Sequence, residues 1–178
     1  MDLSLLINYL NPAQIVGIIA SGFIIIGYGI KHDTHLKIVI AIGATLFSVH
    51  FFMIGAFTAM MVGIINIFRV MLSIKFHGSW YLFIFFITIY TIAGALTYQN
   101  WYDLFPIISA FASTTGMYLL SGIPFRIMAL GSSFAWLSHN IAVLSIGGII
   151  TTGSTILSLL SAIIRLYFDK HRHKQQEE

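Results

Sequence analysis

Long apolar stretches separated by short polar breaks constrain this chain more than any other feature. Each stretch approaches the roughly 20 residues that an α-helix needs to cross a lipid bilayer. Hydrophobic residues make up 58% of the sequence and charged residues 8%, and the mean hydropathy is +0.91. This composition cannot supply the polar surface that a soluble globule needs. The chain is therefore expected to be an all-α, polytopic membrane protein.

The polar breaks predict seven transmembrane helices. Asn11 and Pro12 fit the N-cap and first turn of the first helix. Residues 3–10 are too short to span and are expected to form an interfacial or re-entrant lead-in, and the charged residues 169–178 are expected to form a cytoplasmic tail. The predicted helices cover residues 14–30, 37–55, 58–76, 80–98, 104–120, 125–144 and 148–168.

Two parts of the chain match each other at an offset of 89 residues. The matched residues are Lys37, Ile38 and His50 in the first copy and Arg126, Ile127 and His139 in the second. Because the copies are four helices apart, they insert with the same polarity. We therefore expect one membrane domain, residues 1–178, in which two parallel three-helix bundles (14–76 and 104–168) are joined by a linker helix (80–98), a 3+1+3 arrangement.

The positions of the nine Lys and Arg residues predict the orientation. All nine lie at or near one side of the predicted membrane domain, and cytoplasmic loops carry the excess of such residues. The N terminus is therefore expected outside and the C terminus in the cytoplasm. This asymmetry also accounts for the pI near 9.3, so the lipid bilayer is the expected partner and nucleic acid is not. The absence of cysteine excludes disulfides and thiol chemistry.

Two histidines, His50 and His139, are placed inside predicted helices. A buried polar group without a hydrogen-bond partner costs several kcal/mol, and a neutral imidazole both donates and accepts. Ionisable residues within the membrane indicate function by default. The two histidines are expected either to line a shared cavity or to bond neighbouring helices together. Asn66, in the third predicted helix, has the same two alternatives.

Arg69 lies three residues after Asn66 and on the same helix face. It is expected to snorkel toward the cytoplasmic interface near Lys75, or to pair there, with the binding of an anionic solute as the alternative. Arg165 matches Arg69 in the last turns of the seventh predicted helix and is expected to pair with Asp169, four residues later.

Small residues at close spacing form another pattern. Gly17 and Ser21, like Ala112 and Gly116, are four residues apart, which lets helix backbones approach closely. The small and weakly polar residues 151–154 open the last predicted helix in a similar way. Helix packing is the expected role of these residues, and a flexible gate is the alternative.

The chain resembles the YgjV family of small bacterial inner-membrane proteins along its whole length. Residues 50–55, 66–69 and 104–108 carry most of this resemblance. The resemblance implies a location in the bacterial inner membrane and implies no activity.

A more distant resemblance is to the SWEET, semiSWEET and PQ-loop proteins. It rests on His50 followed by Gly55, on Asn66, and on a second set formed by Trp136, His139 and Asn140. It implies a carrier that moves a small solute by alternating access, with His50, Asn66, Trp136, His139 and Asn140 as the substrate-binding residues. The Pro-Gln dipeptide of those proteins is absent here, so a sugar is not implied.

Two functions from different classes therefore remain. The first is a carrier of a small solute, and the alternative is a non-transporting scaffold or receptor-like membrane protein that uses the same repeat. An enzyme is not expected, because no Asp or Glu lies within a predicted helix core and no HExxH or phosphate-binding loop is present. No catalytic residue, metal or cofactor is predicted, and His171 and His173 are expected to belong to a basic end beside lipid headgroups.

Overall fold

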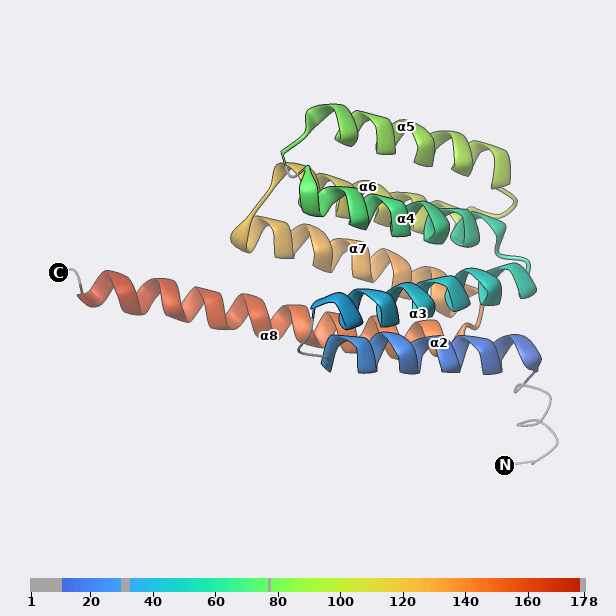
Figure 1. The fold of residues 1–178 in the computed structure, drawn as a ribbon, viewed down its shortest axis with the longest axis horizontal. Helices are drawn as coiled ribbons and strands as arrows, with labels where there is room; N and C mark the ends of the chain where they lie inside the picture. The colour runs from blue at the N-terminus through green and yellow to red at the C-terminus, as the bar shows by residue number, and fades with distance from the viewer. Residues whose placement is uncertain (1–10, 30–32, 77, 177–178) are drawn as a thin grey trace.

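The computed structural model describes the backbone of residues 11–29, 33–76 and 78–176, and the side chains of residues 11–26, 38–73, 75–76 and 78–167. Within these ranges the chain forms seven α-helices and one short 3-10 helix, and it contains no strand (Figure 1). The all-α prediction is therefore confirmed. The elements are α2 (Pro12–Gly29), α3 (Asp33–Met53), α4 (Phe57–Lys75), α5 (Trp80–Thr97), η1 (Trp101–Asp103), α6 (Leu104–Leu119), α7 (Gly122–Ala142) and α8 (Ile146–Gln176).

The first helix starts as the sequence predicts. α2 begins at Pro12, and the side-chain oxygen of Asn11 accepts a hydrogen bond from the backbone N–H of Gln14 at 3.0 Å. This bond satisfies one of the free N–H groups that every helix N-terminus exposes. The prediction for residues 3–10 lies outside the described residues.

The C-terminal helix differs from the prediction. α8 continues to Gln176, whereas a helix ending at residue 168 and a separate tail were expected. No Gly or Pro follows Gly153, and the Arg, Lys and Gln residues of this end are good helix formers. The helical hydrogen bonds therefore continue past the point where the apolar residues end.

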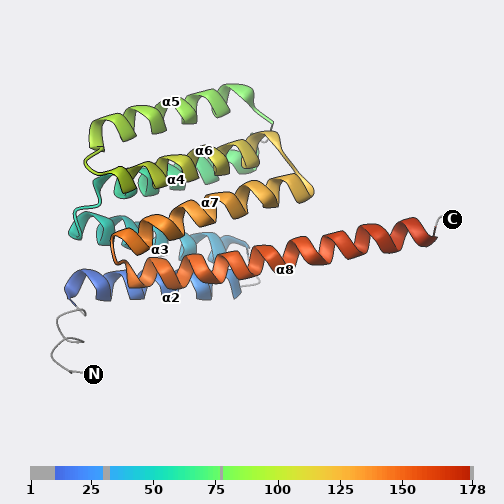
Figure 2. The same cartoon turned by 180° about the vertical axis from the view of Figure 1, so that it is seen from behind.

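The helices lie side by side in three layers of two, with α5 on one edge (Figures 1 and 2). α2 contacts α8, and α4 contacts α6, while α3 and α7 form the layer between these pairs. Consecutive helices also pack together, α2 on α3, α3 on α4, α6 on α7 and α7 on α8. α5 packs against α4 and α6.

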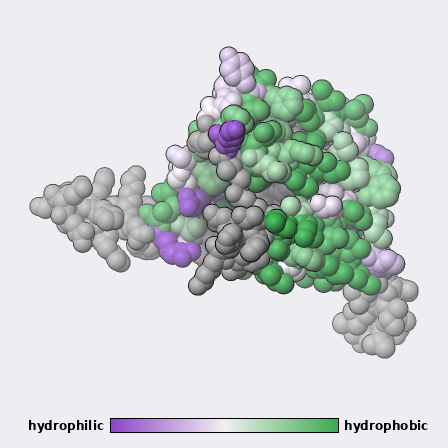
Figure 3. All heavy atoms as spheres, viewed as in Figure 1, coloured by the Kyte–Doolittle hydropathy of each residue, from purple (hydrophilic) through white to green (hydrophobic). Residues whose placement is uncertain are grey.

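The bundle exposes apolar side chains and buries many polar ones. Hydrophobic residues cover much of the face in Figure 3, and Tyr81, Leu96 and Leu157 are 87%, 81% and 68% exposed. The buried polar side chains include Ser48, His50, Thr58, Ser109, Thr114, His139, Asn140 and Ser145. Helices in lipid associate through small and polar residues because burial of apolar surface gives no driving force there.

Among the described residues, two helices are each long and apolar enough to cross a bilayer, namely α5 and the Ile146–Tyr167 part of α8. Shorter apolar segments occupy α2, α3 and α4, over Pro12–Ile26, Ile38–Met53 and Phe57–Ser73. These lengths agree with a membrane protein, and the crossing of the membrane by all seven helices stays a prediction.

Candidate functional site

The turns after α3 and α7 have the same backbone hydrogen bonds at an offset of 89 residues. Gly55 in the first turn and Leu144 in the second both have positive φ, 75° and 52°. In the first turn, the backbone N–H groups of Ile54, Ala56 and Met60 donate to the carbonyl oxygens of His50, Phe51 and Ala56, respectively. In the second turn, those of Val143, Ser145 and Ile149 donate to the carbonyl oxygens of His139, Asn140 and Ser145, respectively. Each turn therefore follows the end of a helix that carries a histidine, and the two turns have the same backbone hydrogen bonds.

The two histidine rings make equivalent bonds as well. His50 Nδ1 lies 2.7 Å from the carbonyl oxygen of Ala13, and His139 Nδ1 lies 3.1 Å from that of Tyr102. In each case the acceptor is 37 residues before the histidine. A carbonyl oxygen only accepts, so Nδ1 carries the proton in both rings and Nε2 is the acceptor of the neutral form. Both side chains are fully buried.

The Nε2 atoms of the two rings differ. His50 Nε2 lies 2.7 Å from Ser145 Oγ, which can donate to it, whereas His139 Nε2 is buried without a hydrogen-bond partner. The residue equivalent to Ser145 in the first half of the chain is Ala56, which has no hydroxyl group. His50 is therefore held at both nitrogens and His139 at one.

Three aromatic rings surround His139. Phe51, Trp136 and Tyr102 have their ring centroids 5.9, 6.0 and 6.1 Å from that of His139. Phe51 and Trp136 also stack on each other at 5.7 Å. This contact joins the last turn of α3 to α7.

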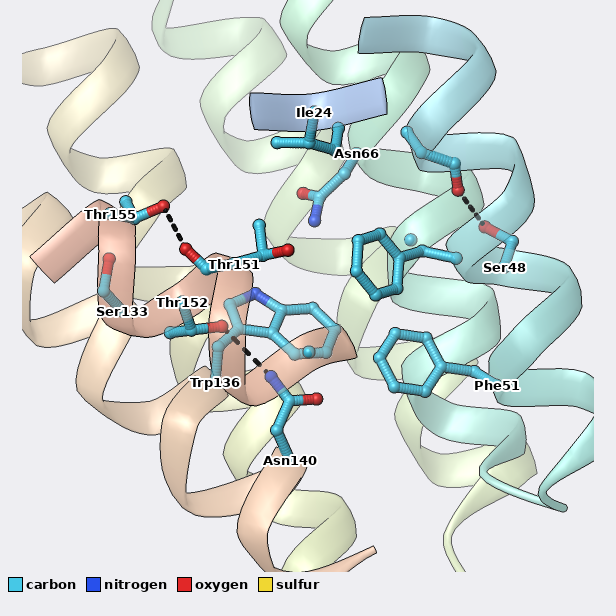
Figure 4. A pocket seen from close by; sticks show the side chains of 14 residues that line it. Ile24, Ser48, Phe51, Asn66, Ser133, Trp136, Asn140, Thr151, Thr152 and Thr155 are labelled. Atoms are coloured by element: carbon cyan, nitrogen blue, oxygen red, sulfur yellow. Dashed lines mark hydrogen bonds between the residues drawn. The ribbon is translucent and has the colours of Figure 1, made fainter. Parts of the chain in front are cut away.

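A cavity of about 240 Å³ lies between α3 and α4 on one side and α7 and α8 on the other (Figure 4). Asn66, Trp136 and Asn140 lie in its wall. The other lining residues are Ile24, Ala44, Phe47, Ser48, Phe51, Gly63, Ser133, Gly148, Thr151, Thr152 and Thr155. None of these side chains is charged, so the cavity offers neutral polar and apolar contacts.

The lining of the cavity repeats the offset of 89 residues. Ten of its fourteen residues form five pairs at this spacing. The pairs are Ala44 with Ser133, Phe47 with Trp136, Phe51 with Asn140, Gly63 with Thr152 and Asn66 with Thr155. In four of the five pairs the member from α7 or α8 is as polar as its partner or more polar. One wall of the cavity is therefore more apolar than the other.

The two asparagine side chains of the cavity lining differ in their hydrogen bonds. Asn66 Oδ1 accepts from the hydroxyl of Tyr90 at 2.7 Å, which fixes the amide so that its nitrogen points into the cavity (Figure 4). Asn140 Nδ2 donates to Thr152 Oγ1 at 3.1 Å, and Asn140 Oδ1 is buried without a partner. The cavity is thus offered a free amide donor by Asn66, whereas the unpartnered oxygen of Asn140 is buried in the packing.

The predicted substrate-binding residues separate into two groups. Asn66, Trp136 and Asn140 line the cavity, and His50 and His139 do not. The histidines are held instead by bonds to neighbouring helices, which was the alternative expected from packing. Thr151 and Thr152 line the cavity, although residues 151–154 were expected to serve packing. The hydroxyl groups of these two threonines were the available signal for a site. The sequence alone does not show that they lie near Asn140.

The expectation that Arg69 snorkels to the interface was wrong. Its side chain is only 4% exposed, and Nη1 donates to Ser113 Oγ at 2.9 Å and to Thr114 Oγ1 at 3.0 Å. Arg69 faces α6 rather than the helix end because these two hydroxyls lie across from it. Arg165 is exposed and donates to Ser161 O at 3.3 Å, so the two arginines are not equivalent. The predicted partner of Arg165, Asp169, has a side chain outside the described residues.

No group of three or more His, Asp or Glu side chains able to hold a metal ion occurs in the described part of the chain. His171 and His173 have side chains outside that part, so the expectation for the basic end stays a prediction.

Comparison with known proteins adds the family. A family model described as "Bacterial inner membrane protein" (Imp-YgjV) matches residues 12–170. The chain is similar to the inner membrane protein YgjV of Escherichia coli strain K12, with 28% identity over 155 residues that cover 87% of this chain and 84% of the relative. No solved structure matches the chain significantly. The matched region contains every described α-helix at least in part, and the chain therefore belongs to the YgjV family of bacterial inner membrane proteins.

Proposed function

We propose that this protein carries a small, uncharged and amphiphilic solute across the inner membrane by alternating access. In this proposal α2–α4 and α6–α8 are two parallel three-helix units that rock about the cavity, and α5 links them as in a SWEET-like carrier. The observation that carries the proposal is the pairing of the cavity residues at an offset of 89 residues. A cavity lined by corresponding residues of two repeats lies where two such units meet, as substrate sites of repeat-built transporters do.

The chemistry of the walls supports the class of solute. Phe47, Phe51 and Trp136 offer aromatic surface, while the free amide nitrogen of Asn66 offers one hydrogen-bond donor. Sites for small molecules combine apolar walls with a few placed polar groups in this way. The volume of about 240 Å³ is slightly below the usual range for ligand pockets, roughly 300–1,000 Å³, so the solute is small.

The proposal includes the orientation. If all seven helices span the membrane, the distribution of basic residues favours an N terminus outside and a C terminus in the cytoplasm. A reporter that is active only outside the cytoplasm, fused to the C terminus, should then be inactive, and activity there would reverse this part of the proposal.

The alternative is a non-transporting scaffold, which the bonding of His50 favours. The ring nitrogens of His50 bond to Ala13 of α2 and to Ser145 in the turn before α8. Gln14 of α2 accepts from Ile146 N and donates to Leu144 O. These bonds tie the two halves together. A carrier must break or shift some of them in each cycle, whereas a scaffold keeps them.

Fluorescence of Trp136 provides a direct test of solute binding. Trp80 and Trp101 are 55% and 66% exposed and do not line the cavity, so replacing both by Phe leaves Trp136 as the single tryptophan, which can be excited selectively over the tyrosines. The purified protein is titrated with a panel of small uncharged metabolites, and each compound that quenches or shifts the emission is tested for uptake into proteoliposomes. Saturable quenching together with uptake is the expected result.

A matched pair of variants locates the effect. Thr155 lines the cavity and bonds only to its own helix backbone, and its neighbour Ser154 is exposed with a bond of the same kind. Thr155→Phe should fill the cavity and abolish quenching and uptake, while Ser154→Phe should leave both unchanged. Binding without uptake would favour the scaffold or receptor-like alternative, and equal uptake in both variants would exclude this cavity as the path.

A further inference from the structure

Arg69 is a buried cation whose partners are all neutral. Its side chain is 4% exposed and bonds to the hydroxyls of Ser113 and Thr114. Those hydroxyls donate their own protons to backbone carbonyls, Ser113 to Ser109 O at 2.8 Å and Thr114 to Ala110 O at 2.6 Å. Arg69 Nε is buried and has no hydrogen-bond partner. The guanidinium therefore has unused donor capacity and full positive charge.

No carboxylate neutralises this charge among the residues with described side chains. Asp103 is the acidic side chain within those ranges, and its carboxylate accepts from the backbone N–H groups of Gln99 and Asn100. A charge buried in a protein or bilayer costs several kcal/mol unless it is paired. Two neutral hydroxyl dipoles satisfy hydrogen bonds but leave a net charge of +1 in the helix bundle.

The depth of Arg69 indicates where a counter-ion comes from. α4 has 19 residues from Phe57 to Lys75, so Asn66 is at its middle. At 1.5 Å per residue, Arg69 lies about 4.5 Å past the middle and about 9 Å before the end of the helix. Lipid phosphates lie beyond the helix ends, so a headgroup would have to enter the bundle by about 9 Å to reach the guanidinium. A small soluble anion fits this depth better.

A row of hydroxyl groups connects the site to the cavity wall. Ser133 lines the cavity, and its neighbour Ser132 bonds to Ser109 at 2.8 Å. Ser109 accepts through its carbonyl from Ser113, the partner of Arg69. Buried, hydrogen-bonded hydroxyl groups therefore link the Arg69 site to the wall of the cavity.

We propose that Arg69, with Ser113 and Thr114, is the binding site of a small soluble anion that bears a carboxylate or phosphate group. The guanidinium supplies the positive charge and a free N–H. The hydroxyls of Ser113 and Thr114 hold the guanidinium in place. The site is separate from the cavity, and the inference does not depend on the carrier function.

Thermal unfolding of the full chain tests this inference, with inorganic phosphate and acetate as the probes. The protein is placed in nanodiscs of phosphatidylcholine, and the unfolding midpoint is followed against anion concentration, with sodium chloride keeping the ionic strength constant. A ligand that binds only the folded state raises the unfolding midpoint, by about 5–10 °C at a hundredfold excess over Kd. Phosphate also stabilises proteins because it is excluded from their surface. Comparison with the variants below therefore identifies the part of the midpoint shift that is due to specific binding at Arg69.

Arg69→Gln should abolish the saturable rise, and Arg126→Gln should keep it, because Arg126 is partly exposed and donates to Gly122 O. Arg69→Lys keeps the charge and provides a second test if the Gln variant does not fold. Its apparent Kd should be about tenfold weaker because lysine lacks the planar donor fork.

The inference is overturned if the wild-type protein shows no saturable rise of the unfolding midpoint, or if Arg69→Gln or Arg69→Lys responds as the wild type does. A midpoint that responds to added phosphatidylglycerol and not to either soluble anion overturns it in favour of a lipid headgroup. Anion binding without any solute uptake would support the Arg69 site and would contradict only the proposed carrier function.

Discussion

His50 and His139 are equivalent residues, 89 positions apart, and each bonds through Nδ1 to the carbonyl oxygen 37 residues before it. The equivalence ends at Nε2. His50 Nε2 lies 2.7 Å from Ser145 Oγ, and His139 Nε2 has no partner because Ala56 stands at the position that corresponds to Ser145. The turns after α3 and α7 therefore share their backbone hydrogen bonds, but His50 is bonded at two ring nitrogens and His139 at one.

Replacing Ser145 by Ala should lower the free energy of unfolding by about 1–3 kcal/mol, since it leaves His50 Nε2 buried without a donor. It also removes the bond from Gly148 N to Ser145 Oγ at the start of α8. Unfolding by SDS in mixed micelles measures the change. Ser161→Ala is the control, because Ser161 is exposed on the same helix and bonds only to Leu157 O. An equal effect of both variants would contradict a special role for Ser145.

Replacing Ala56 by Ser should stabilise the protein by about 1 kcal/mol, because the new hydroxyl gives His139 Nε2 the donor that it lacks. The same unfolding assay measures the gain. In a His139→Phe background the gain should disappear. A stabilisation that persists without the imidazole would show that the serine acts through another contact.

The two turns give a matched test of backbone strain. Leu144 has φ 52° and is 57% exposed, and Gly55 at the equivalent position has φ 75°. The left-handed conformation costs a residue with a Cβ atom about 1–2 kcal/mol. Leu144→Gly should therefore stabilise the protein, and Gly55→Ala should destabilise it by a similar amount. Changes of the same sign in the two variants would argue against strain as the cause.

Gly17 and Gly22 on α2 test the close approach to His50. A Cβ atom on Gly17 would lie 2.9 Å from His50 Nδ1, and one on Gly22 would meet nothing within 4 Å. Hydrogen bonds at both nitrogens prevent the ring from moving away, so Gly17→Ala should destabilise by about 1–3 kcal/mol. Gly22→Ala should be neutral or stabilising by up to about 1 kcal/mol, because alanine is the better helix former. Thermal unfolding in detergent distinguishes the two outcomes.

Local sequence features predicted the helices well. The apolar stretches place all seven α-helices, and Asn11 with Pro12 marks the start of α2. These features depend on residues within a few positions of each other, so they can be read along the chain. The end of α8 was missed because a helix of charged residues can continue after the apolar segment ends.

The candidate site was predicted only in part. Asn66, Trp136 and Asn140 line the cavity, and the polar residues Thr151, Thr152 and Thr155 that face them had been assigned to packing or passed over. His50 and His139 lie outside the lining. A scarce polar residue in an apolar helix shows that a partner must exist, but it does not show whether that partner is a solute or another helix.

The sequence by itself determined the class of protein, the positions of the helices and the offset of 89 residues at which the two histidines correspond. Tertiary structure alone decided what each polar side chain meets. Arg69 is buried against α6 while Arg165 is exposed, and Ser145 reaches a histidine 95 residues earlier in the chain. Such partners are set by which helices pack together and at what height. That choice depends on contacts between distant segments, which no spacing within one helix records.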